Sequence, residues 1–216
     1  MLDYLKSTKA MPLMRLEVRT TIVPVAGKRL LISPGSMLTE AQLRSAAPID
    51  AIVAPSLLHT AGVPAAARVF PEAQLWGVPG VREKHPQLKW HGILGVDPWP
   101  WQAELPLFPL RGLPRTHETL LLHRASGSLI LMDAVFNILE PDGIGARLFT
   151  RLVGTSRRLA VSRILLALNQ DREALRASLK EVLAQEFDRL VPSHGEVVPS
   201  GGKEGFLKAL RERGLA

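Results

Sequence analysis

Cysteine is absent from the 216-residue sequence. Disulfide bonds and thiolate metal sites are therefore excluded, and any metal ion must be held by histidine and carboxylate side chains. Long apolar runs are absent as well, because no stretch reaches the roughly 18 residues that a transmembrane helix needs. The N-terminal residues also lack the extended apolar core of a secretory signal. These absences predict a cytoplasmic protein with no membrane partner.

Acidic residues are outnumbered by basic ones, 20 against 27, which gives a net charge of +7. The excess is greatest between Arg147 and Arg163, where five arginines occur without one acid. Such a stretch can bind nucleic acid, but single strands are also recognised by aromatic side chains. Aromatic residues make up only 5% of this sequence. We therefore interpret the stretch as a solvent-exposed basic face and expect no nucleic-acid partner.

The first third of the chain alternates between apolar strand patterns and short helices. The expected elements are strands at 14–25, 28–33, 50–54 and 73–77, and helices at 39–47 and 62–70. Thr39 and Gln42 have the spacing of a capping box, which marks the start of a helix. Strands that alternate with helices in this way predict an α/β layer arrangement.

The rest of the chain divides into three parts. Residues 86–116 are rich in proline and tryptophan and predict little regular structure beyond an edge strand near 103–110. The remaining expected elements are strands at 118–123, 127–133 and 188–192, a helical segment at 143–185 and a helix at 203–214. No internal repeat or low-complexity linker interrupts the chain, so we expect a single domain over residues 1–216.

Four polar residues lie where expected strands end: His59, His123, Asp133 and His194. Strand ends deliver side chains to one rim of a layered α/β fold, where functional sites gather. Asp133 follows the apolar run "SLILM", and a carboxylate there is unusual without a partner or a metal ion. Taken singly, each residue also fits a capping or core role.

The order of these residues resembles the metallo-β-lactamase superfamily. The stretches "VAPSLLHT", "HRASGSLILMD" and "PSHG" occur in the order of its motifs, which begin with His-x-His-x-Asp-His-x-x-Gly and end with Pro-Gly-His-Gly. The stretches "ISPG" and "FPEAQLW" make the chain similar to an uncharacterised branch of that superfamily. The resemblance spans residues 14–200. It implies an αββα sandwich, in which two mixed β-sheets pack face to face with helices outside both.

The first motif is incomplete. His59 matches its last histidine, but its other three ligand positions fall on Ala54, Ser56 and Leu58, which cannot bind zinc. One of the two metal sites of the family therefore keeps only His123, and the resemblance implies that this site is lost.

The second metal site keeps three of its four ligands. Asp133 matches the bridging aspartate of the family and His194 the final histidine. The resemblance therefore implies one zinc or iron ion on His59, Asp133 and His194. His123 would lie beside it as a catalytic residue, although "HRASG" is one residue longer than the usual motif.

Two functions follow from this interpretation. The first is a metal-dependent hydrolase of a small molecule, an ester, thioester, lactone or phosphoester. Glu118 and His117 are candidates either to orient the metal ligands or to carry protons. The alternative is a metal-free, non-catalytic relative whose rim binds a partner, since Leu58 replaces a carboxylate ligand. The sequence leaves homo-oligomerisation open under both interpretations.

Overall fold

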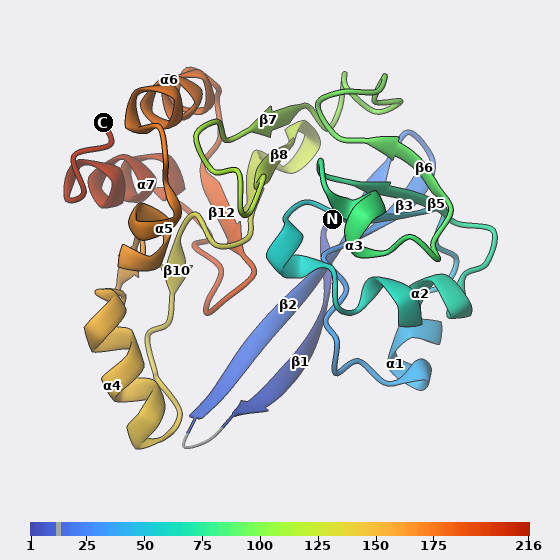
Figure 1. The fold of residues 1–216 in the computed structure, drawn as a ribbon, viewed down its shortest axis with the longest axis horizontal. Helices are drawn as coiled ribbons and strands as arrows, with labels where there is room; N and C mark the ends of the chain where they lie inside the picture. The colour runs from blue at the N-terminus through green and yellow to red at the C-terminus, as the bar shows by residue number, and fades with distance from the viewer. Residues whose placement is uncertain (12–13) are drawn as a thin grey trace.

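Two mixed β-sheets form the centre of the computed structural model, which describes residues 1–11 and 14–216 (Figure 1). The strand order is β1-β2-β3-β4-β5-β6 in the larger sheet and β12-β9-β8-β7 in the smaller. The strands of the larger sheet are β1 (Asp3–Met11), β2 (Met14–Val25), β3 (Lys28–Ile32), β4 (Ala51–Ala54), β5 (Gln74–Gly77) and β6 (Trp90–Ile93). Those of the smaller are β7 (Leu107–Pro109), β8 (Thr119–His123), β9 (Ser128–Leu131) and β12 (Arg189–Pro192). A separate pair consists of β10 (Phe136–Asn137) and β11 (Leu159–Ala160).

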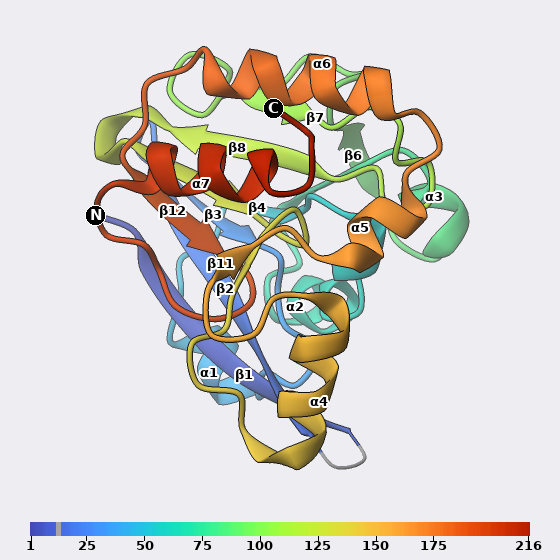
Figure 2. The same cartoon turned by 90° about the vertical axis from the view of Figure 1, so that its left-hand side faces the viewer.

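Helices cover the outer faces of both sheets. They are α1 (Glu40–Arg44), α2 (Val63–Val69), α3 (Val81–Lys84), α4 (Gly143–Val153), α5 (Arg163–Leu168), α6 (Arg172–Leu183) and α7 (Gly202–Arg211), with 3₁₀ turns η1 (Leu57–His59) and η2 (Arg124–Ser126). Figure 2 shows α6 and α7 in front of the smaller sheet. None of the described helices has the length and hydrophobicity needed to cross a bilayer. This architecture confirms the αββα sandwich that the resemblance implied.

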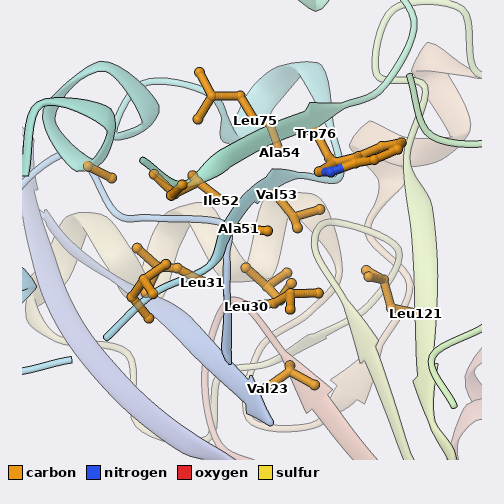
Figure 3. Packing of buried hydrophobic residues seen from close by; sticks show 14 of the residues in the cluster. Val23, Leu30, Leu31, Ala51, Ile52, Val53, Ala54, Leu75, Trp76 and Leu121 are labelled. Carbon is orange, nitrogen blue, oxygen red and sulfur yellow. The ribbon is translucent and has the colours of Figure 1, made fainter. Parts of the chain in front are cut away.

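The smaller sheet packs through alternate residues of each strand, as a strand with two covered faces must. On β8, Leu121 belongs to the apolar core that also contains the larger sheet. Its neighbours Leu120 and Leu122 face the other way and join the core of α6 and α7. Figure 3 shows the side chain of Leu121 pointing toward the strands of the larger sheet. The two cores therefore hold the two sheets and the outer helices in one fixed stack.

Several elements differ from the sequence-based expectation. Strand β1 was not predicted, because polar residues such as the exposed Lys6 and Thr8 interrupt any apolar alternation, yet it pairs with β2 over its whole length. Strand β6 lies in the segment expected to be irregular and pairs with β5 in parallel. The helical segment at 143–185 is broken twice: Gly154 and the short strand β11 separate α4 from α5, and residues 169–171 separate α5 from α6. The other expected strands and the capping box of Thr39 and Gln42 are present.

Candidate metal centre

Three of the residues singled out in the sequence meet at one rim of the two sheets. His59 lies in η1 just after β4, and Asp133 and His194 follow the ends of the parallel neighbours β9 and β12. One ligand atom from each of the three residues lies within 4.8 Å of the others. His59 and His194 are buried, and the side chain of Asp133 is 17% exposed. The cluster has the donor set of a site that could hold a metal ion.

The turn that carries His59 is fixed at both ends. The Ser56 hydroxyl accepts a hydrogen bond from Leu58 N, and Leu57 N donates to the Thr116 carbonyl at 2.8 Å. A Cβ at Gly62 would clash with the carbonyl of Pro34, so only glycine allows this close approach. The loop therefore explains why the sequence has a glycine three residues after His59.

Two serine hydroxyls lie near Nδ1 of the His59 imidazole, the ring nitrogen that does not face Asp133. Ser33 Oγ lies 2.8 Å from Nδ1 and Ser193 Oγ lies 3.4 Å from it. Ser193 donates its own hydroxyl proton to the Arg19 carbonyl, so it can only accept from the imidazole. The arrangement favours a proton on Nδ1, which leaves Nε2 as the atom that faces Asp133.

His194 is held by a carbonyl and a ring. Its Nδ1–H donates to the Glu17 carbonyl at 2.9 Å, and the imidazole stacks on Phe136 with 5.1 Å between ring centroids. Gly195, at a φ of +89°, lies so close to the Asn137 carbonyl that a side chain would clash there. The imidazole of His194 therefore has a defined orientation and a defined proton position.

Arg19 is a buried residue that the sequence did not single out. Its Nη1 donates to the carbonyls of Pro192 and Gly195, each at 2.7 Å, and so ties down the loop that carries His194. Burial lowers the pKa of Arg19, while nearby Glu17 opposes this effect. In the sequence, Arg19 is only a charged residue inside an expected strand, and such a residue normally faces solvent. Its burial depends on a loop from far along the chain, so nothing in the sequence indicates it.

Asp133 faces both imidazoles. Its Oδ2 lies 3.2 Å from His59 Nε2, and its Oδ1 lies 3.4 Å from His194 Nε2. Burial alone would raise the pKa of Asp133, but the two imidazoles outweigh burial and hold that pKa well below its usual range. Oδ2 has no hydrogen-bond partner of suitable geometry among the described residues. A buried polar atom in this condition costs free energy unless something else binds it.

The proton positions test whether a metal ion fits. Because Nδ1 of His194 donates to a carbonyl, the neutral ring carries a lone pair on Nε2, and this lone pair faces an oxygen of Asp133. Two acceptors in contact repel unless a proton or a cation lies between them. Ligand atoms of one tetrahedral zinc ion are about 3.3 Å apart. The observed 3.2 and 3.4 Å, which involve different oxygens of Asp133, are close to this value, and one ligand atom from each residue lies within 4.8 Å of the others. The residues present therefore fit a cation.

Glu118 lies beneath the cluster and is fully buried. Its carboxylate accepts hydrogen bonds from the backbone N–H groups of Met132, Asp133 and Ala134 at 2.8 to 3.1 Å. Burial raises the pKa of Glu118 to about 7 and repulsion from Asp133 adds to the rise, while the backbone donors oppose it. Glu118 thus shapes the loop that presents Asp133 and does not face the open rim. Of the two roles that the sequence left open for Glu118, these contacts favour positioning over proton transfer.

His123 does not lie at the cluster, which corrects the sequence-based expectation. It ends β8 and pairs with Ser128, the first residue of β9, whereas Asp133 follows the last residue of that strand. Its Nδ1 lies 2.7 Å from Ser126 Oγ and its Nε2 lies 3.0 Å from the Pro24 carbonyl. The stretch "HRASG" is the turn of a hairpin, so its histidine and Asp133 lie at opposite ends of the sheet. His117, which precedes β8, is half-buried and also stands outside the cluster.

A cavity of about 170 Å³ opens beside Asp133 and His194. Its wall is mainly apolar, with Leu58, Phe136, Phe149, Ile164, Leu165 and Leu168 among the lining residues. Asp133 and His194 are the charged or titratable groups that line it, and no lysine or arginine of the described residues does so. Leu58, at the position of the missing carboxylate ligand, is 53% exposed. The cavity therefore combines two candidate metal ligands, Asp133 and His194, with an otherwise mainly apolar lining.

Known structures share this architecture. A metallo-β-lactamase from Pontibacter korlensis matches with a TM-score of 0.65 and 13% identity, over 98% of this chain and 99% of that one. One from Erythrobacter litoralis matches with a TM-score of 0.65 and 14% identity, over 97% of this chain and 87% of that one. This chain has the metallo-β-lactamase fold.

A third similar structure is FIM-1 from Pseudomonas aeruginosa in a mono-zinc form. It has a TM-score of 0.59 and 15% identity, over 98% of this chain and 92% of that one. Neither a protein-family model nor the sequence of any curated protein matches this chain. At such low identities the likeness establishes the metallo-β-lactamase fold, and the chemistry must be argued from the residues themselves.

Proposed function

We propose that the protein is a metal-dependent hydrolase with one zinc or iron ion bound by His59, Asp133 and His194. The observation that carries the proposal is the convergence of two imidazole Nε2 atoms on the carboxylate of Asp133, whose Oδ2 is buried and has no suitable hydrogen-bond partner among the described residues. Two histidines and a carboxylate with open positions suit either metal. When bound, such an ion polarises a carbonyl oxygen and activates water for attack.

The remaining residues of the site define what they can bind and orient. The apolar wall formed by Leu58, Phe136 and Phe149 excludes water and receives an apolar group of the substrate. Phosphoesters carry negative charge and are usually held by arginine or lysine, and the described lining has neither. A neutral acyl compound, an ester, thioester or lactone, therefore fits this pocket better than a phosphoester does.

The similar FIM-1 structure in a mono-zinc form supports the single-ion part of the proposal, since it shows one zinc ion in this fold. In our protein, the Glu17 carbonyl and the Ser33 hydroxyl hold the two imidazoles by their Nδ1 atoms, so both Nε2 atoms remain directed at the rim. Partners of this kind orient the histidines of metal sites.

Metal analysis and ester hydrolysis together test the proposal. Protein purified without a histidine tag is expected to carry one zinc or iron ion per chain, and His194→Ala to lose it. The loaded wild type is expected to hydrolyse short-chain neutral esters faster than matched phosphate monoesters, and His194→Ala to lose this activity. A loaded protein that hydrolyses none of these esters would contradict the hydrolase assignment.

A second function is supported by Leu58, which stands where a fourth ligand belongs in the resembling motif. Both imidazoles lie within ion-pair distance of Asp133, so protonated rings would satisfy its carboxylate without a metal. The protein would then be a non-catalytic relative whose apolar pocket binds a small molecule or a partner. Failure to take up metal under any loading condition would favour this function over the hydrolase.

A further inference from the structure

The outer face of α4 carries an unexpected row of apolar side chains. Ile144, Leu148 and Leu152 follow one another at every fourth position and are 81%, 59% and 64% exposed. Their spacing places them on one side of the helix, while Ala146 and Val153 are buried on the other. Single exposed leucines are common on protein surfaces, but an aligned row of three indicates a surface that contacts something apolar.

Arginines flank this row. Arg147 and Arg151 are exposed on the same helix, each one residue before a leucine of the row. Three more arginines surround the C-terminal end of α4: Arg163 donates to the Leu152 carbonyl, and Arg158 and Arg213 donate to the Gly154 carbonyl.

Acidic groups near α4 are few. Residues 143–170 contain no acid. Glu140 and Asp142 precede the helix, and Glu212 pairs with Arg158 at 2.8 Å. The middle and the C-terminal end of α4 are therefore both apolar and positively charged.

The helix is open to solvent along this face. It lies at the left edge of the molecule in Figure 1, and Figure 2, which views that side, shows no other described element in front of it. Its inner face packs on β2, so the apolar row is not needed to hold α4 to the fold.

We propose that the outer face of α4, formed by Ile144, Leu148 and Leu152 with Arg147 and Arg151, docks on the surface of an anionic lipid bilayer. The apolar row would enter the boundary between headgroups and acyl chains, and the arginines would contact the phosphate groups. The absence of a spanning segment predicted no membrane partner, but an amphipathic helix can lie on a bilayer surface without crossing it.

The charge pattern favours lipid over two other occupants. A second copy of the chain related by twofold symmetry would bring the arginines of both helices together, and like charges repel. A nucleic acid would neutralise the arginines but leave the apolar row exposed to water. An anionic bilayer satisfies both features at once, and the proposal does not depend on metal binding at the rim.

Vesicle sedimentation tests the docking directly. The full-length protein is expected to sediment with phosphatidylcholine vesicles that contain phosphatidylglycerol, and far less with pure phosphatidylcholine. Leu148→Glu and Ile144→Glu are each expected to weaken binding about tenfold, and Arg147→Glu about fivefold or more. High salt is expected to weaken binding by the wild type, because it screens the arginines.

Matched controls lie on other faces of the molecule. Val96 is 70% exposed and Arg68 is an exposed arginine of α2, so Val96→Glu replaces an exposed aliphatic side chain, and Arg68→Glu an exposed arginine, outside α4. Both are expected to bind vesicles as the wild type does, and circular dichroism of every variant should match that of the wild type. Equal vesicle binding by Leu148→Glu, Ile144→Glu and the wild type would overturn the proposal. So would dimerisation through α4, or binding to nucleic acid but not to vesicles.

Discussion

Histidines lie near both ends of the β8–β9 hairpin, and their ring nitrogens have different partners at the two ends. At the turn, both nitrogens of His123 have partners, the Ser126 hydroxyl and the Pro24 carbonyl. At the rim, His59 and His194 direct Nδ1 at a hydroxyl and a carbonyl, and direct Nε2 at the carboxylate of Asp133. The turn therefore has a complete hydrogen-bond network around its histidine, whereas at the rim the Nε2 atoms and the carboxylate oxygens remain available as ligands of a cation.

This difference shows that a histidine at a strand end is not by itself a candidate ligand. What separates the two ends is whether a ring nitrogen faces an ordinary hydrogen-bond partner or another potential metal ligand. The rim also has supports that the turn lacks, namely Glu118 beneath Asp133 and Arg19 behind His194. Variants of these residues can therefore separate stability from metal binding.

Glu118→Ala is expected to have the largest effect on stability. It leaves three buried backbone N–H groups without their acceptor, which should lower the free energy of unfolding by about 4 kcal/mol. Urea denaturation of metal-free protein measures the change. Glu118→Gln keeps one acceptor oxygen and should lose about half as much; a loss under about 1 kcal/mol for the alanine variant would contradict the supporting role of Glu118.

Arg19→Met is expected to affect both stability and metal binding. The Pro192 and Gly195 carbonyls lose their buried donor, which should cost about 3 kcal/mol of unfolding free energy. Because the loop also positions His194, metal affinity should fall by about 10- to 100-fold. Calorimetric titration with zinc measures the affinity, and an unchanged affinity would show that the loop holds His194 without Arg19.

His123→Ala is expected to lower the stability of the protein without changing its metal content, whereas a variant of a metal ligand loses the metal ion. The change leaves the Pro24 carbonyl without its donor and should cost about 2 kcal/mol of unfolding free energy. Metal content per chain should remain that of the wild type, because the residue lies at the far end of β9 from Asp133. Loss of metal in this variant would restore the sequence-based placement of His123 at the site.

Acid titration is expected to give a smaller effect, carried by Asp133. Its pKa in the folded protein is lowered by the two imidazoles, so the ionised carboxylate stabilises the fold above the unfolded pKa of about 3.9. This contribution is lost as the pH falls. Each pH unit below about 4 should remove up to about 1.4 kcal/mol more from the wild type than from Asp133→Asn. Parallel losses in urea denaturation of the two metal-free proteins would argue against the imidazole–carboxylate contacts.

Motifs in the sequence predicted the three residues of the cluster because each follows a strand with a recognisable apolar run. His123 was misplaced because its role came from the resemblance alone. The expected strands at 118–123 and 127–133 already put it next to a turn, one strand length away from Asp133. Arg19 was missed because the loop that buries it comes from more than 170 residues along the chain. Strand β1 was missed for a related reason, because its pairing with β2 and not its own pattern makes it a strand.

Metal binding by Leu58→Asp and Leu58→Asn tests the central claim, that the rim holds one metal ion, most directly. Leu58 is exposed beside Asp133 and His194, so either change should leave the fold intact, and only aspartate adds a charged oxygen ligand. In calorimetric titration of metal-free protein with zinc, we predict one ion per chain for the wild type. Leu58→Asp should bind this ion about tenfold more tightly, Leu58→Asn as the wild type does, and His194→Ala not at all. A wild type and a folded Leu58→Asp that both fail to bind zinc or ferrous iron would contradict the claim.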